Sequence, residues 1–521
     1  MRQKFLDIKM MFFGNPNTVR DYRTQMRGNR APILWTIYLF FLIGIAALMY
    51  MNVSRNSVMS IVEMQRGLKG FYSQVIILLE VMLFLVAPVL TGTSIVGEYQ
   101  RRSIELIETA PMTPAQFIVG KLISSWRLVW MLLILSLPVT SVCIVMGGAT
   151  WKEVLETYLL MSLHGLLYAA LALPIAVLAK KVVSTVFMSY VALGVAHIAF
   201  LLLIPSVLMS SFSGNKEMPV LASLIGGTSQ IMAGKITMIG SIQIPVYLAS
   251  IPIHLILVAL LVAGASSAMT RFGSGETRTL RIVGLIAAAA VSAAMSWSLA
   301  PAVSLLSGMS AGGSSSPFIS DVSYILFAGM CMLGLGLLPC IPSMACYSLY
   351  EDKKHAPSPL FDFKNILNAT PGSAIPYGLA LAIMSYLGSG IVLMFYKGDF
   401  PLFDHRCVWF ILIYMFFVSL GRMVSSWIKA GVEASIKGHF AAIVFSILMP
   451  LPVLVMSGIY RSGQFDPLWI AYPFSAPFLQ ETWQQIICLV ITCILIIAAL
   501  MIESSSLRNL KAKVSYSEPA R

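Results

Sequence analysis

Six ionisable residues interrupt long apolar runs of the sequence: Glu80, Arg127, His164, His197, His254 and Arg422. If these runs cross a bilayer, a charge at mid-depth costs roughly 2.5–3.5 kcal/mol, so each side chain should face a partner or a polar cavity. We assign Glu80, His197 and His254 to a polar translocation path between helices. The alternative is that Glu80 pairs with another helix and that the histidines are hydrogen-bonded packing residues.

A second group of charged residues lies in the polar segment GEYQRRSIELIETAPMTPAQFIVGKL, from Gly97 to Leu122. Glu98 directly follows an apolar run, and two isoleucines further on form a narrow apolar stripe. The charged residues off this stripe are Arg101, Arg102, Glu105 and Glu108. Pro111 and Pro114 then end the helical pattern before the next apolar run. The segment predicts a short amphipathic helix that is held between two spans and can push on both.

Four arginines recur at intervals of three and four residues near the N-terminus: Arg20, Arg23, Arg27 and Arg30. Asn15 can cap a helix that begins at Pro16, and this helix would carry the four guanidinium groups on one face. Each contact between such a group and an anionic lipid head group contributes about 1 kcal/mol. The segment is therefore either a positively charged membrane anchor or a lever helix between the membrane and a cytoplasmic partner.

The sequence lacks the motifs of nucleotide-binding, metal-binding and hydrolytic sites. Gly120–Lys121 and Gly234–Lys235 are Gly-Lys pairs, but neither has the earlier glycine and the following Ser or Thr of a phosphate-binding loop. No His, Asp and Glu residues have metal-ligand spacing, and the seven cysteines are best explained as small apolar packing residues. We expect no cofactor on this chain, no enzymatic activity of its own, and an energy source in a separate subunit.

The elements that position these residues belong to a chain too apolar for a soluble protein. Of its 521 residues, 58% are hydrophobic and only 11% are charged, whereas soluble proteins carry about 25% charged residues. A helix needs about 20 apolar residues to cross a ~30 Å hydrocarbon core. The segments that qualify are 33–53, 72–96, 123–147, 154–179, 183–209, 244–269, 281–301, 322–346, 373–396, 407–428, 439–460 and 484–503. The sequence thus predicts an all-α integral membrane protein of twelve transmembrane helices.

The basic residues indicate how the spans are oriented. With the N-terminus in the cytoplasm, 24 of the 35 Lys and Arg residues fall in inside segments and 9 in outside loops. This is the bias expected of cytoplasmic loops, so both termini should be cytoplasmic. The net charge of +13 is then explained by lipid head groups and a cytoplasmic partner, without nucleic acid.

The two halves of the chain have similar loop patterns. Pro111 and Pro371 lie 260 residues apart, each near the end of a polar segment after the second span of its half. The predicted parts are a cytoplasmic amphipathic segment at 1–32, a first six-helix half at 33–270 with a loop at 97–122, a linker at 271–281, a second half at 281–503 with a loop at 349–372, and a tail at 504–521. Repeats of this kind are typical of transporters. The apolar stretches Val220–Ile236 and Arg461–Trp483 are either re-entrant or membrane-hugging loops.

The first polar loop resembles that of ABC-2 type transporter permeases. Their pattern is roughly a Glu at the span end, then Gly/Ser-x-Glu-Leu, Thr-x-Pro and Gly-Lys. The residues that match in order are Glu98, Ser103, Glu105, Leu106, Pro111, Gly120 and Lys121. The segment Asn15–Ala31 is also similar to the opening of many such permeases, an Asn-Pro followed by arginines and Arg-Gly-x-Arg. The resemblance is clearest over roughly residues 15–125.

The resemblance implies roles for these residues. The Asn15–Ala31 segment would be a connecting helix, and Gly97–Lys121 would be a coupling helix that docks on an ATPase subunit. Its coupling residues would be Glu98, Arg101, Arg102, Glu105, Leu106 and Pro111. Glu351 and Asp352 occupy the equivalent place in the second half, but two lysines and two prolines replace the Ser-x-Glu-Leu run there. The two loops would therefore engage their ATPases unequally.

We therefore expect the permease subunit of an ATP-driven transporter of ABC-2 type, an exporter in the cell inner membrane. Its partners would be membrane lipids and two cytoplasmic ABC ATPase subunits, which would hold ATP and Mg²⁺. Two other classes remain open. An ion-gradient-driven secondary transporter with a 6+6 repeat would need several intramembrane carboxylates. A lipid-modifying membrane enzyme would need a cluster of His, Asp or Arg at one membrane face.

Overall fold

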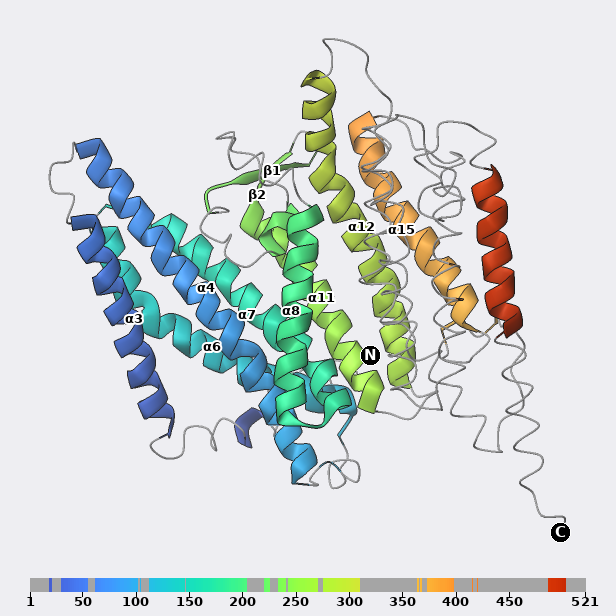
Figure 1. Ribbon diagram of the computed structural model, residues 1–521, viewed down its shortest axis with the longest axis horizontal. Coiled ribbons are helices and arrows are strands. Elements are labelled where there is room, and N and C mark those ends of the chain that lie inside the picture. Colours follow the sequence, from blue (N-terminus) through green and yellow to red (C-terminus); the bar gives the residue numbers. More distant parts are fainter. Residues whose placement is uncertain are drawn as a thin grey trace, which may run out of the picture. The chain divides into compact units, whose positions relative to one another are not determined.

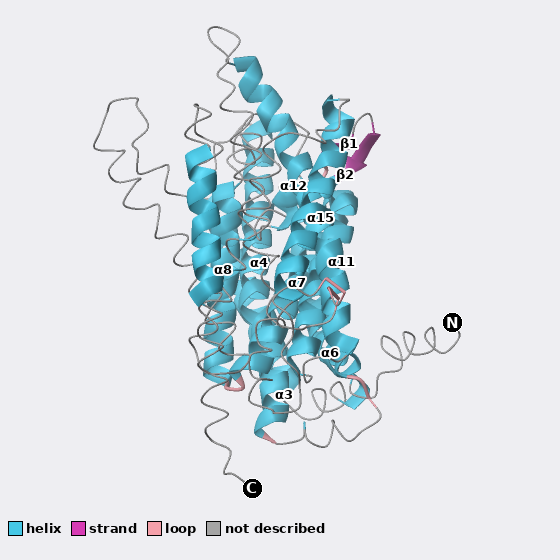
Figure 2. Ribbon diagram, turned by 90° about the vertical axis from the view of Figure 1, so that its right-hand side faces the viewer, coloured by secondary structure: helices cyan, strands magenta, loops and turns pink. Residues whose placement is uncertain are grey.

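Long apolar helices make up nearly all of the chain that the computed structural model describes (Figure 1, Figure 2). The described residues are 18–20, 30–54, 61–101, 104, 112–145, 147–203, 220–224, 233–239, 242–269, 275–309, 363–364, 366–367, 373–397, 415, 419 and 486–502. Within them, five helices are long and apolar enough to cross a membrane: Gly67–Gln100, Pro114–Val145, Trp151–Ala179, Val246–Met269 and Ile375–Val392. These helices indicate a multi-pass helical membrane protein.

Nine of the twelve predicted spans coincide with helices in this described part of the chain. The helices are α3 (Arg30–Ser54), α4 (Ile61–Gln100), α6 (Pro114–Val145), α7 (Trp151–Ala179), α8 (Val182–Leu203), α11 (Val246–Met269), α12 (Gly275–Met309), α15 (Ala374–Lys397) and a last helix at Ile486–Ile502. The predicted spans 322–346 and 439–460, and nearly all of 407–428, lie outside the described residues. The count of twelve therefore stays a prediction.

The helices differ from the predicted spans mainly at their ends. The 40 residues of α4 extend over about 60 Å, roughly twice the ~30 Å hydrocarbon core. The helix α6 begins well before the predicted residue 123, because Thr113 and Gln116 form a reciprocal cap with distances of 3.2 and 3.1 Å. The helix α12 begins inside the predicted linker 271–281. Hydropathy identifies only the part of a helix that lies in lipid. The predicted spans therefore leave out polar turns that extend the same helix beyond the lipid.

The described helices fall into two compact units, Met1–Met269 (unit 1) and Thr270–Arg521 (unit 2). In unit 1 the central helix is α7, which packs against α4, α6, α8 and α11. Because it is surrounded by other helices, α7 is apolar on nearly all sides rather than on one stripe. Its start is fixed by a capping box between Thr150 and Glu153, and it ends at Lys180, which adopts the left-handed conformation with φ of 53°.

Small residues let neighbouring helices approach closely in both units. A Cβ atom on Gly165 of α7 would lie 2.6 Å from Val129 of α6. In unit 2, α12 packs against α15, and a Cβ on Gly388 would collide with the carbonyl oxygen of Ala289. These contacts hold the helix pairs at distances that a larger side chain would not allow.

The all-α prediction missed one feature, a short β-hairpin between α8 and α11. It follows the 3₁₀ helix η1 (Val220–Leu224) and consists of β1 (Ile236–Ile239) and β2 (Ile242–Pro245). The strands are antiparallel, with Ile236 opposite Pro245. The hairpin lies directly before α11, so a hydropathy window merges strand β2 with the membrane span.

Candidate functional site

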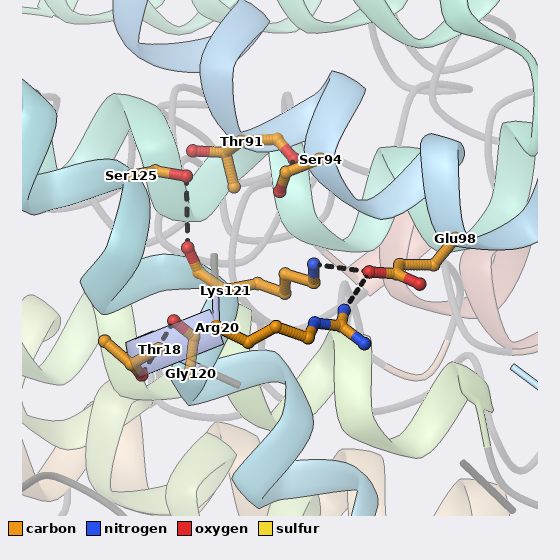
Figure 3. A network of polar contacts seen from close by, with 8 residues as sticks. All are labelled: Thr18, Arg20, Thr91, Ser94, Glu98, Gly120, Lys121 and Ser125. Carbon is orange, nitrogen blue, oxygen red and sulfur yellow. Dashed lines mark hydrogen bonds and ion pairs between the residues drawn. The ribbon is translucent and has the colours of Figure 1, made fainter. Parts of the chain in front are cut away.

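A cluster of charged residues joins the end of α4 to the start of α6 and to the N-terminal fragment Thr18–Arg20 (Figure 3). We call it the Glu98 cluster; its members are Thr18, Arg20, Glu98, Gly120 and Lys121. Lys121 Nζ donates to Glu98 Oε1 at 2.9 Å. Arg20 donates from Nη2 to the same oxygen, and Figure 3 shows both cations converging on it. Thr18 Oγ1 donates to the carbonyl oxygen of Gly120 at 3.3 Å.

The three charged residues of the Glu98 cluster differ in burial. The side chains of Glu98 and Lys121 are 8% and 2% exposed, whereas that of Arg20 is 49% exposed. Glu98 and Lys121 therefore form a buried ion pair between two helices, and Arg20 covers it from the surface. Near the same end of α4, Lys180 at the end of α7 lies 5.4 Å from the ring centre of Tyr99, a distance that allows a cation–π contact.

Glu98 and Lys121 come together because Glu98 lies near the end of α4 and Lys121 lies near the start of α6. After α4 ends at Gln100, Arg101 continues in an exposed turn, in which its N–H donates to the Gly97 carbonyl at 3.1 Å. Thr113 then caps α6. The loop between Arg101 and Thr113 is thus fixed at both ends to helices that share a buried ion pair.

The structure describes only some of the predicted coupling and connecting residues. Glu98 lies in the cluster and Arg101 is exposed beside it. The others lie outside the described residues: Arg102, Glu105, Leu106, Pro111, Glu351, Asp352, Arg23 and Arg27. Arg30 is the first residue of α3. Arg20 contacts the Glu98 carboxylate. The sequence predicted contacts with lipid head groups and did not indicate this protein partner.

A second polar cluster lies inside unit 1, where α4, α7, α8 and α11 meet. We call it the Glu80 cluster; its members are Glu80, His164, Tyr168, His197 and His254. His164 Nδ1 lies 3.1 Å from Glu80 Oε1, and the rings of His164 and His254 are 5.6 Å apart. Tyr168 OH lies 3.2 Å from His197 Nε2. The three residues assigned to a polar path are thus brought into one neighbourhood.

His164 is the centre of the Glu80 cluster, although its sequence context favoured a packing role. Its side chain is 1% exposed and that of Glu80 is 3% exposed. Its Nε2 atom lies 2.5 Å from the carbonyl oxygen of Ser223 in η1. A lone histidine in an apolar run gives no local signal of partners that lie far away in the sequence.

Arg281, near the start of α12, is a further buried charge that was not selected from the sequence. Its Nη1 donates to the carbonyl oxygen of Ile366 and, at 2.9 Å, to Ser373 Oγ. Its guanidinium lies 4.7 Å from the ring centre of Tyr377, whose hydroxyl donates to the Arg281 carbonyl at 2.8 Å. Arg281 therefore ties α12 to the end of the second predicted loop and to the start of α15.

Comparisons of the chain with protein-family models, with curated proteins and with solved structures found no match. The clusters are therefore interpreted from their chemistry. Among the described residues, no three His, Cys, Asp or Glu side chains are grouped so that they could hold a metal ion. The Glu98 cluster can transmit a displacement between helices, and the Glu80 cluster can hold a proton.

Proposed function

We propose that the chain is the permease subunit of an ATP-driven transporter of ABC-2 type and that it works as an exporter. On this proposal it has twelve transmembrane helices in the cell inner membrane, with both termini in the cytoplasm. Two cytoplasmic ATPase subunits bind ATP and Mg²⁺ and dock on the loop between α4 and α6. The proposal is supported by the apolar helices and by the loop pattern from Glu98 to Lys121.

The observation that carries the proposal is the buried pair of Glu98 and Lys121. A loop that couples ATP hydrolysis to transport has to pass its displacement to the transmembrane helices. The 2.9 Å contact between the two side chains joins the helices on both sides of the loop. Because the pair is buried, water does not readily replace either partner, and a push on the loop moves α4 and α6 together.

The fragment Thr18–Arg20 adds a third segment to this junction. Arg20 binds Glu98 and Thr18 binds the Gly120 carbonyl, so the fragment spans the ends of both helices. A connecting helix in this place would transmit movement of the loop to the N-terminal segment. Its arginines would also carry the contacts with anionic lipid head groups.

Copurification tests the proposal. A tagged chain, purified from its native membrane after mild crosslinking, should bring down a nucleotide-binding subunit, and reconstituted complexes should hydrolyse ATP. The change Glu98→Ala should lower ATP hydrolysis or uncouple it from transport. Lys152→Gln serves as a control. Lys152 is an exposed basic residue near the start of α7, whereas the Glu98 cluster lies near the end of that helix. Absence of any ATPase partner, together with flux that follows an ion gradient, would refute the proposal.

One observation favours a second candidate, an ion-gradient-driven secondary transporter. The Glu80–His164 pair is a buried ionisable pair within predicted spans, and such pairs occur in proton relays. Vesicles separate the two candidates: with ATP held constant, a protonophore should leave the flux of an ATP-driven exporter intact. It should abolish the flux of a proton-driven transporter.

A further inference from the structure

His164 contacts two oxygen atoms, one on each side of its ring. Nε2 faces the Ser223 carbonyl oxygen at 2.5 Å, and Nδ1 faces Glu80 Oε1 at 3.1 Å. A carbonyl oxygen only accepts, so Nε2 must carry a hydrogen. The contact at Nδ1 then has two possible forms. Either Nδ1–H donates to the Glu80 carboxylate, or a protonated Glu80 donates to a bare Nδ1.

Both forms contain the same number of protons. Each holds one proton more than a carboxylate next to a neutral imidazole, and the two forms differ only in which residue carries it. When this proton leaves, the imidazole has a single N–H for two acceptors. One of its two contacts then places a lone pair against a lone pair in a buried position, and that contact must open.

The neighbouring titratable groups do not need an extra proton. His197 and His254 lie 2.8 and 2.9 Å, through Nδ1, from the carbonyl oxygens of Leu193 and Ser250. A neutral tautomer that donates Nδ1–H satisfies each of these contacts. Tyr168 OH is placed to donate to His197 Nε2, and His254 Nε2 has no partner among the described residues.

The remaining helix packed on α7 is α6, and its ionisable side chains lie elsewhere. Lys121 is bound to Glu98, and Arg127 is exposed. The segment η1, which supplies the Ser223 carbonyl, contains no ionisable side chain in its sequence VLASL. Among the described residues, the extra proton is therefore assigned to Glu80 and His164.

The contact that depends on this proton holds η1, which lies between α8 and α11 in the sequence. Val220 and Leu224 of η1 are buried, and His164 binds the backbone between them. A second contact holds the same segment further along, where the Gly234 N–H donates to Glu156 Oε2 at 2.6 Å. Glu156 and His164 both belong to α7, so the two contacts hold η1 and the approach to the hairpin against one helix.

We infer that the Glu80–His164 pair is a binding site for one proton and that the bound proton holds η1 against the transmembrane helices. When the proton leaves, the single remaining N–H stays with the charged Glu80 carboxylate, which is the stronger acceptor. The Ser223 contact then opens and η1 is released, while the Glu156 contact still holds Gly234. On the proposed topology η1 belongs to the outside loop between α8 and α11. The inference depends on unit 1 alone and stands whether or not an ATPase drives the protein.

The change Glu80→Gln tests whether the contact between His164 and Ser223 depends on the extra proton. The amide NH₂ of the introduced glutamine would donate to Nδ1 of a neutral His164, whose Nε2–H still donates to Ser223, so the contact forms without the extra proton. Hydrogen–deuterium exchange of the peptide that contains η1 should be measured in lipid nanodiscs from pH 5 to pH 10. Dividing the exchange rate of the unaltered chain by that of Glu80→Gln at each pH removes the intrinsic effect of pH on amide exchange.

At low pH the ratio should be close to one. Above the midpoint of the pair it should rise by up to about tenfold per pH unit, because the protonated population falls at that rate. The change His164→Phe should speed exchange of η1 at every pH. Ser223→Ala is the matched control and should leave the pH response intact, since it keeps the backbone carbonyl. A ratio that stays within twofold over the whole range, or normal protection of η1 in His164→Phe, would overturn the inference.

Discussion

Replacing Glu98 by glutamine removes one charge from a buried pair while keeping the size of the side chain and one acceptor oxygen. Lys121 is only 2% exposed, so its ammonium group would then face a neutral amide in a site with little access to water. At 2.9 Å and an effective dielectric constant of about 20, the lost attraction is about 6 kcal/mol before desolvation is considered. Loss of one partner of a buried pair typically costs about 3–5 kcal/mol, and we expect Glu98→Gln to fall in that range.

Thermal unfolding of the purified protein in nanodiscs measures this effect. A loss of about 3–5 kcal/mol should lower the Tm by about 3–5 °C for a chain of 521 residues, because an entropy of unfolding of about 2.1 cal/mol/K per residue sums to about 1.1 kcal/mol/K. The double variant Glu98→Gln with Lys121→Met removes both charges and should recover a large part of the loss. Arg20→Gln is the control, because its half-exposed side chain is screened by water and should contribute only about 0.2–1 kcal/mol.

The double-mutant cycle gives the result that would refute this reasoning. A coupling energy of about 2 kcal/mol or more between positions 98 and 121 is expected for a buried pair. If the effects of Glu98→Gln and Lys121→Met add to within about 0.5 kcal/mol, the two residues act independently. The pair would then not join α4 to α6, and the transmission of force through it would fail as well.

Three further changes test other contacts. Gly388→Ala should lower the Tm through a loss of about 1–3 kcal/mol by forcing α15 away from the backbone of α12, whereas Gly264→Ala, which meets nothing within 4 Å, should be neutral or stabilising. Glu156→Ala removes the acceptor of the Gly234 N–H and should speed deuterium exchange in the turn before β1, with no new dependence on pH. Arg281→Lys keeps the charge but loses the planar stacking and the double donation from Nη1, so limited proteolysis should cut between α12 and α15 faster than in the unaltered chain.

The sequence predicted where helices lie far better than it predicted what joins them. Apolar runs of about 20 residues locate spans because lipid imposes that length. The start of α6 also had a local signal, the pattern TPAQ that begins at Thr113 and forms the cap. The hairpin had only a weak signal, because its strands of four residues adjoin a span of similar hydropathy.

The contacts of the two clusters could not be read from spacing. Glu98 and Lys121 belong to one matched loop pattern, but Arg20 lies 78 residues before Glu98, and only the packing of helices brings it there. His164 lies 84 residues after Glu80 and 59 before Ser223. Its role follows from having an oxygen atom on each side of its ring, which depends on tertiary structure alone.

The two clusters are joined by α4, which carries Glu98 near its end and Glu80 eighteen residues earlier, about 27 Å away along the helix. Pro88 lies between them, and a proline inside a helix removes a backbone hydrogen bond and favours a bend. The Leu85 carbonyl oxygen, one turn before it, accepts a hydrogen bond from Tyr190 of α8 at 2.6 Å, so the helix has an outside partner at this point.

A displacement at the Glu98 end therefore has two outcomes, a larger bend at Pro88 or a shift of Glu80 relative to His164. The second outcome changes the 3.1 Å contact on which the bound proton depends. Linkage then works in both directions. If movement of the loop weakens proton binding by a given free energy, proton binding must oppose that movement by the same free energy. Movement of a coupling loop at one end of α4 and proton binding within the bundle would thus be thermodynamically coupled. The bend at Pro88 would set the strength of this coupling.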